Sequence, residues 1–184
     1  AGVACLTAAA LPERIERLVL IDGLGAVTTP AAESAAQLRK SLRASRRSRS
    51  VAPRYPDSKT AVAARVAGGV TPIDADTATP LVERNLIREA DGHVRLRTDG
   101  RLLWPSPVRL SPEQALALLG AIKAPVLLIE GERGILVERD MARAARAAVP
   151  QLRREVLPGG HHLHLEPESV DAVAEAIANW QVAP

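Results

Sequence analysis

Three of the four histidines of this 184-residue chain lie within four positions of one another, directly after two consecutive glycines. They are His161, His162 and His164. An imidazole has an ordinary pKa of about 6.5, so it can take up and return a proton near neutral pH. A histidine on a glycine-containing loop is therefore a candidate general base. The competing interpretation is a hydrogen-bonded loop histidine without a chemical role.

Acidic residues stand at the ends of two apolar runs elsewhere in the chain. The run from Arg17 ends in Asp22 and Gly23, and the run from Ala124 ends in Glu130, Gly131 and Glu132. A run that is apolar at every position is typical of a strand buried on both faces in a parallel sheet. In such sheets the chemistry gathers at the carboxyl ends of the strands. We therefore expect these acids and His161 to lie at one edge of a sheet.

The remaining pattern supplies the elements that would hold these residues. We predict strands at 17–23, 124–131 and 154–159, and helices at 1–11, 140–150 and 167–180. Helices that alternate with buried strands predict an α/β fold with a parallel sheet. The two segments 1–27 and 121–184 would form this core.

The segment 28–120 has a different composition, rich in Pro, Ser and Arg. We predict helices at 32–44, 58–67 and 79–89, one short strand at 93–97, and a helix that begins after Ser111, with Ser111 and Gln114 as an N-cap box. We interpret 28–120 as an inserted helical cap above the strand ends. The alternative is a second domain with its own core.

Composition limits the function classes. Apolar residues make up 47% and charged residues 24% of the sequence, which is ordinary for a soluble globular protein. The single cysteine, Cys5, excludes an internal disulfide and favours a reducing, cytoplasmic compartment. No apolar run approaches the roughly 20 residues that span a bilayer, and no signal peptide is recognisable, so no membrane partner is expected.

A basic run is the main feature that could suggest nucleic acid. The formal net charge is only +3, and only Tyr55 stands near the run to stack on a base. A solvated helix face explains the run better than a phosphate site does, so no nucleic-acid partner is expected. Its seven basic residues are Arg39, Lys40, Arg43, Arg46, Arg47, Arg49 and Arg54.

Three stretches together resemble the C-terminal portion of an α/β-hydrolase, closest to the serine hydrolase-like group. They are the opening helix with its following strand, Ala1 to Gly23; the strand Ala124 to Gly131; and Gly159 to Glu168, with its histidines. The resemblance implies a partial α/β-hydrolase fold with three parallel C-terminal strands, flanking helices and the inserted helical cap. It implies hydrolysis of an ester-like small molecule, with no cofactor and no metal.

The resemblance also assigns roles by position. His161 matches the catalytic base of the family. The family commonly places its acid in Gly-x-x-Asp after the penultimate strand, but here that window ends in Gly134. Some members place the acid after the preceding strand, where this chain has Asp22. We predict Asp22 as the acid, with Glu132 as the alternative; a turn-forming Asp without a chemical role is the other interpretation of Asp22.

The family nucleophile lies in a Gly-x-Ser-x-Gly turn, and that motif is absent from the 184 residues. The opening helix has neither an initiator Met nor an N-cap residue, so we expect the nucleophile, Ser or Asp, just before Ala1. The chain by itself is then predicted to be inactive, and its first strand to expose an apolar edge. The alternative is a non-catalytic remnant or binding module of the same fold.

A metal site is a rival interpretation of the histidine stretch. In an extended segment, His162, His164 and Glu166 would share one side. Their spacing is tighter than that of the usual zinc signatures, and the family needs no metal. A general base is therefore the favoured prediction.

Overall fold

The computed structural model describes residues 1–47, 53–69, 71–136 and 140–182. The chain divides into two compact units. The first combines Ala1–Ala32 with the C-terminal part from Arg109 onward, and the second is Glu33–Val108. Each unit is considered by itself.

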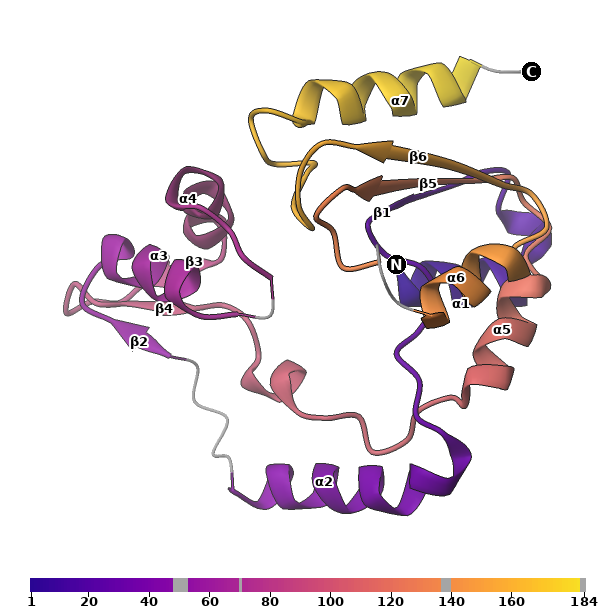
Figure 1. Cartoon of the computed structure of the whole chain (residues 1–184). Coiled ribbons are helices and arrows are strands. Elements are labelled where there is room, and N and C mark those ends of the chain that lie inside the picture. The colour runs from indigo at the N-terminus through magenta and orange to yellow at the C-terminus, as the bar shows by residue number, and fades with distance from the viewer. Residues whose placement is uncertain (48–52, 70, 137–139, 183–184) are drawn as a thin grey trace. The chain divides into compact units, whose positions relative to one another are not determined.

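The described part of the first unit contains a parallel sheet of three strands (Figure 1). These are β1 (Leu18–Ile21), β5 (Val126–Gly131) and β6 (Leu152–Leu157), in the order β1-β5-β6. Leu18 pairs with Val126, which pairs in turn with Leu152, so all three strands end at the same edge. The predicted α/β class and its three parallel strands are confirmed.

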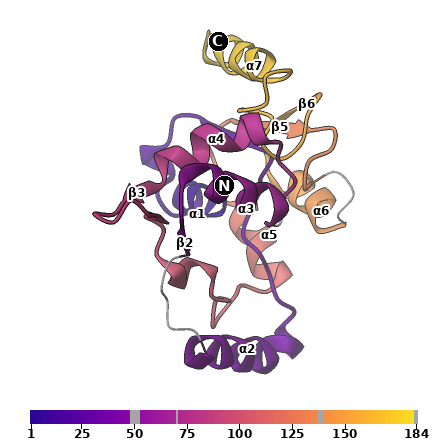
Figure 2. The ribbon, with the colours of Figure 1, turned by 90° about the vertical axis from the view of Figure 1, so that its left-hand side faces the viewer.

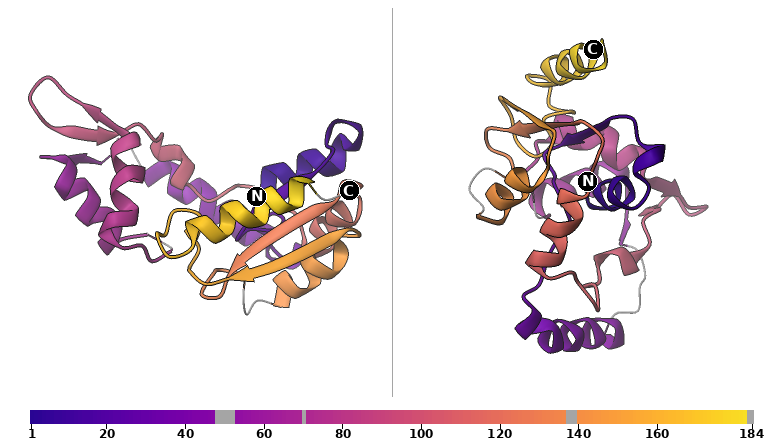
Figure 3. Two further views of the ribbon diagram at one scale, coloured as in Figure 1. Left: turned by 90° about the horizontal axis from the view of Figure 1, so that it is seen from above. Right: turned by 90° about the vertical axis from the view of Figure 1, so that its right-hand side faces the viewer.

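Helices cover both faces of this sheet. They are α1 (Gly2–Ala10), α5 (Pro112–Gly120), α6 (Asp140–Ala148) and α7 (Val170–Val182), with a 3₁₀ turn at Pro12–Arg14. Helix α1 packs on α5, α5 packs on α6, and α7 contacts β5 and β6. Figure 2 and Figure 3 show α7 on one side of the sheet and α6 on the other.

Burial on both faces explains the apolar run Val126–Ile129 of the central strand β5. Val126 and Leu128 belong to the core beneath α1, α5 and α6, whereas Leu127 and Ile129 belong to the core beneath α7. All four side chains are buried. Strand β1 is less enclosed, because Val19 and Ile21 are only partly buried. Burial on both faces is therefore complete for β5 and incomplete for β1.

Strand β6 lies two residues earlier than predicted. It begins at Leu152, and Pro158, which has no N–H to donate to a ladder, follows its last residue. Gly159 then adopts a positive φ of 118°, which turns the chain out of the sheet. Because β6 ends at Leu157, the loop that follows it begins at Pro158 and contains the three histidines.

Helix α5 begins as predicted. The Ser111 side chain accepts from the Gln114 backbone N–H, and the Gln114 side chain accepts from the Ser111 N–H at 2.9 Å. Because α5 packs on α1 and α6, residues 109–120 lie with the first unit. The predicted boundary at residue 120 had placed them in the insertion.

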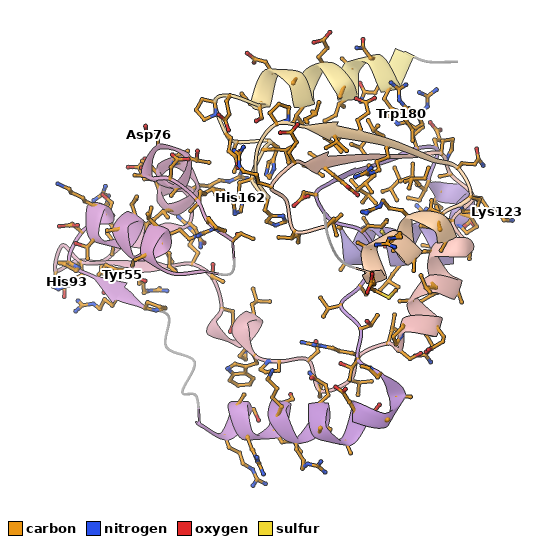
Figure 4. The ribbon with its side chains drawn as sticks, in the orientation of Figure 1. Tyr55, Asp76, His93, Lys123, His162 and Trp180 are labelled. Carbon is orange, nitrogen blue, oxygen red and sulfur yellow. The ribbon has the colours of Figure 1, made fainter. Side chains whose placement is uncertain are left out.

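The second unit has a small antiparallel sheet of its own, in the order β2-β4-β3. Helices α3 and α4 pack on each other, and Ala61, Val82 and Val94 form a small core. Figure 4 labels Tyr55, in β2, and His93, just before β4. The elements are 3₁₀ turns at Ala31–Glu33 and Gly100–Leu103, α2 (Ser34–Arg47), β2 (Arg54–Tyr55), α3 (Ser58–Ala67), α4 (Ala75–Arg84), β3 (Leu86–Arg88) and β4 (Val94–Leu96).

One predicted helix in this unit is misplaced. The helix expected at 79–89 begins at Ala75, because the Asp74 side chain accepts from the Thr77 N–H at 2.9 Å and caps it. It ends at Arg84, and Leu86–Arg88 pairs with β4 instead. Antiparallel pairing with the next strand along the chain overrides the helical pattern there. The strand predicted at 93–97 is confirmed as Val94–Leu96.

Among the described residues, no helix is both long and apolar enough to cross a membrane.

Candidate active site

Asp22 directly follows β1 and is held in an unusual backbone conformation. Its φ is +41°, the left-handed region that a short polar side chain tolerates better than most. Its N–H donates to Ile129 O at 2.7 Å, which extends the pairing of β1 with β5. The side chain is fully buried. Such strained and buried positions cluster at functional sites.

The Asp22 carboxylate receives backbone N–H groups from the turn after β5. Ile135 N donates to Oδ2 at 2.9 Å, and Gly131 N donates to Oδ1 at a longer 3.4 Å. These dipoles offset part of the cost of burying a carboxylate without a cation.

His161 lies on the loop after β6, and the surrounding chain holds that loop in place. Glu166 Oε2 accepts from Gly160 N at 2.9 Å, and Ser169 Oγ donates to Pro158 O at 2.7 Å. Leu163 is completely buried beneath α7. Figure 4 shows the neighbouring His162 at this end of the sheet and Lys123 at the opposite end.

The structure brings Asp22 and His161 together across 139 residues of sequence. His161 Nδ1 lies 2.8 Å from Asp22 Oδ2. The imidazole is 30% exposed, whereas the carboxylate is fully buried. An ionised carboxylate can only accept, so this bond requires a proton on Nδ1 and leaves Nε2 as the basic nitrogen.

The alternative acid lies elsewhere. Glu132 follows β5 with an exposed side chain, although its backbone N–H donates to Leu157 O. In the described part of the chain, Asp22 is the carboxylate hydrogen-bonded to His161. No Ser, Thr or Cys side chain among the described residues is hydrogen-bonded to that imidazole.

The other two histidines of the stretch lie close by, His162 against His161 and His164 against His162. The rings of His161 and His162 meet edge to face, with centroids 5.0 Å apart. Burial lowers the pKa of His164, and the charge of the nearby His161 lowers it further. Glu166, the acid of the rival metal site, directs its carboxylate to the backbone of Gly160. The described residues contain no group of three or more ligands placed to hold a metal ion.

A cavity of about 520 Å³ opens beside the pair in the first unit. Its described polar lining includes Asp22, His161 and His164, and no Lys or Arg contributes to it. The arrangement therefore combines a basic nitrogen, an acid behind it and an uncharged space in front. Its apolar lining includes Ile21, Leu24, Leu119, Ile135, Leu136 and Met141.

A second fully buried carboxylate, Glu130, ends β5 next to this site. It accepts from Arg146 Nη1 at 3.0 Å and from Arg154 Nε and Nη2 at 2.9 and 2.8 Å. Its strand-end position suggested a site residue, but its charge is compensated within the fold. No sequence pattern indicates this ion cluster, because its members come from three separate elements.

The predicted basic run lies in the second unit. Arg39, Lys40, Arg43 and Arg46 are exposed on α2, and Arg54 pairs with Glu89 at 2.6 Å and with Asp91. Arg49 lies outside the described residues.

Known proteins similar to this chain were found by sequence and by structure. No family model matches the sequence. A serine hydrolase-like protein of Dictyostelium discoideum is 26% identical over 178 residues, which cover 90% of this chain and 49% of that protein. A serine hydrolase-like protein of Danio rerio is also 26% identical, over 56% of its length. The chain thus spans about half the length of these curated relatives.

The solved structures agree with this result. The crystal structure of a hypothetical protein from Pseudomonas aeruginosa has a TM-score of 0.86 at 39% identity and covers 98% of this chain and 64% of that one. A thioesterase domain from the curacin biosynthetic pathway has a TM-score of 0.70 at 24% identity, over 96% of this chain and 61% of that domain, and supports the fold alone. With its parallel sheet, its strand-end site and its similarity to serine hydrolase-like proteins, the chain has a partial fold of the α/β-hydrolase superfamily.

Proposed function

We propose that this chain supplies the general base and the orienting acid of a hydrolase that acts on a small ester-like substrate. The observation that carries the proposal is the 2.8 Å contact between His161 Nδ1 and the buried Asp22, beside an apolar cavity. His161 is the base and Asp22 the acid. The nucleophile comes from outside the 184 residues.

Each proton in this mechanism has a defined place. Nε2 of His161 accepts the proton of the nucleophile hydroxyl as that oxygen attacks the ester carbonyl, and the resulting imidazolium returns the proton to the leaving alcohol. Asp22 stabilises the imidazolium through Nδ1–H without taking up the proton itself. His161 then deprotonates a water that releases the acyl group.

The cavity indicates the chemical class of the acyl group. Apolar side chains dominate the described lining, and no Lys or Arg side chain is present there to pair with an acidic substrate. A carboxylate or phosphate in this space would lose its hydration without compensation. We therefore expect a neutral, apolar acyl group. We propose that the segment 28–120 is the inserted cap of such a hydrolase.

The first test uses the chain as it stands. Removing the nucleophile of a comparable hydrolase costs on the order of a million-fold in turnover. Hydrolysis of p-nitrophenyl acetate and butyrate by the 184 residues should therefore stay at the buffer rate. Turnover that disappears in His161→Ala would show that the nucleophile lies within the chain and would refute its proposed external position.

The second test extends the polypeptide by its own upstream coding sequence. If this contains Gly-x-Ser-x-Gly, the extended protein should hydrolyse these esters and react with a fluorophosphonate probe. His161→Ala should abolish both. His93→Ala in the second unit is the matched control and should change neither. An extended protein with the motif but no His161-dependent hydrolysis would contradict the proposal.

A binding module of the same fold is the second candidate, favoured by the absence of Gly-x-Ser-x-Gly from these residues. It predicts that apolar esters bind without turnover in the extended protein as well. An upstream Asp in the nucleophile position would instead direct the chemistry toward epoxides or haloalkanes.

A further inference from the structure

We propose that Gly134 is a positioning residue: the missing side chain at this position creates the space in which the Asp22 carboxylate meets His161. This inference rests on the proposed roles of Asp22 and His161. The resemblance gives position 134 as the common place of the family's acid, but it assigns no role to a glycine there.

The geometry is restrictive. A Cβ built on Gly134 would lie 2.1 Å from Asp22 Oδ1, 2.6 Å from Cγ and 2.7 Å from Oδ2. Non-bonded carbon and oxygen atoms do not approach so closely. Any residue other than glycine at 134 therefore requires the carboxylate or the turn to move.

The Asp22 carboxylate has little freedom to move away. Its residue is fully buried, its backbone is in the left-handed region, and its Oδ2 already binds both Ile135 N and His161 Nδ1. Displacing the carboxylate breaks one of these bonds in a buried setting. An unsatisfied buried polar group destabilises the folded state.

The turn that contains Gly134 has equally little freedom. Gly134 N donates to Gly131 O at 2.8 Å, and the next residue, Ile135, supplies the amide that holds Asp22. Moving the turn to admit a side chain would carry this amide away from the carboxylate. The same short segment thus supports Asp22 and must leave space for it.

Side chains on residues 22 and 134 would therefore occupy the same space. Asp22 Oδ2 is 2.7 Å from the Cβ position of residue 134 and 2.8 Å from His161 Nδ1. A carboxylate on residue 134 could consequently reach the imidazole, provided that residue 22 carries no side chain. Glycine at 22 would also adopt the left-handed backbone without strain. The geometry allows one acid at this location, from either strand end.

The test reads the protonation of the ring by ¹⁵N NMR of histidine-labelled protein at mildly alkaline pH, with His161 assigned by its loss in His161→Gln. The original chain should show the proton on Nδ1. Gly134→Ala should lose this Nδ1–H signature. Gly120→Ala is the control: its Cβ would meet only Ala148 O at 3.6 Å, an ordinary contact, so the signature should remain.

Relocation of the acid provides a test that does not depend on the folding of Gly134→Ala. The pair D22G/G134A removes the clash and should fold without the Nδ1–H signature. The pair D22G/G134D should restore the signature. Retention of Nδ1–H in Gly134→Ala, or failure of D22G/G134D to restore it in a folded protein, would overturn the inference.

This readout requires no turnover, so the two proposals can fail separately. If the extended protein never hydrolyses an ester but the NMR pattern holds, the positioning role survives and the proposed function fails. If hydrolysis is observed but Gly134→Ala leaves the ring unchanged, only the positioning role fails.

Discussion

Two fully buried carboxylates lie at the ends of neighbouring parallel strands, and their surroundings differ completely. Glu130, at the end of β5, is held between Arg146 and Arg154. Asp22, after β1, is held by two backbone N–H groups and an imidazole. Both are inaccessible to water. Only Asp22 borders the apolar cavity.

The difference is one of compensation. Two guanidinium groups, which stay charged, compensate the charge of Glu130, and these ion pairs link β5 to α6 and β6. Asp22 instead contacts two backbone N–H groups and the imidazole of His161. Its negative charge stabilises this imidazole most when the ring carries a positive charge. A buried acid paired with fixed cations supports the fold, whereas one paired with an imidazole can support proton transfer.

The largest expected effect is on turnover at Asp22. In the extended protein, Asp22→Asn should lower kcat by about 10⁴-fold, the loss known from another hydrolase whose triad acid was changed in this way. The free energy of unfolding should change by much less than the free energy of activation that this loss in kcat represents. Steady-state ester hydrolysis and urea denaturation measure the two quantities. A large drop in the free energy of unfolding with an unchanged kcat would instead make Asp22 a structural residue.

The next effect is on stability at Glu130. Glu130→Gln should lower the free energy of unfolding by about 3 kcal/mol, because it leaves the Arg146 charge, only 16% exposed, without its partner. The ring protonation of His161 should not change. Glu168→Gln is the control: its pair with Arg133 is more than 60% exposed on both sides, so the loss should stay below about 1 kcal/mol.

A smaller effect is expected at Glu166, which braces the loop of His161. Glu166→Gln weakens a charge-assisted hydrogen bond to Gly160 N and should cost about 1 kcal/mol of stability. In the extended protein, we expect kcat to fall by about tenfold, since a loosened loop misplaces the base. An unchanged kcat with reduced stability would make Glu166 purely structural.

The smallest effect concerns pH and His164. Its folded pKa lies below the ordinary 6.5, so the unfolded chain takes up this proton first as the pH falls. The contribution of His164 to the free energy of unfolding is therefore fully present above about pH 6.5 and is lost as the pH falls toward the folded pKa. Thermal melts across this range should show a flatter dependence in His164→Gln. An identical slope in the two proteins would exclude the contribution of His164.

Much of the framework could be predicted from the sequence because its signals are local. The unbroken apolar run of β5, the Ser111 cap and the glycines before His161 each lie within a few residues. The position of Asp22 at the edge of the sheet could also be predicted, because a strand followed by an acid has a definite place in an α/β sheet.

The remaining features depend on distant segments meeting. Arg154 reaches Glu130 only because β6 pairs with β5, and Ile135 reaches Asp22 across 113 residues. The importance of Gly134 is likewise invisible in sequence, because it depends on a side chain that would have to occupy space held by Asp22.

The most direct test of the central claim is the protonation of the His161 ring, measured by ¹⁵N NMR in the unmodified chain, Asp22→Asn and Glu130→Gln. We predict the proton on Nδ1 in the unmodified chain and in Glu130→Gln, and its loss from Nδ1 in Asp22→Asn. A ring protonated on Nε2 in the unmodified chain, unchanged by Asp22→Asn, would contradict the account.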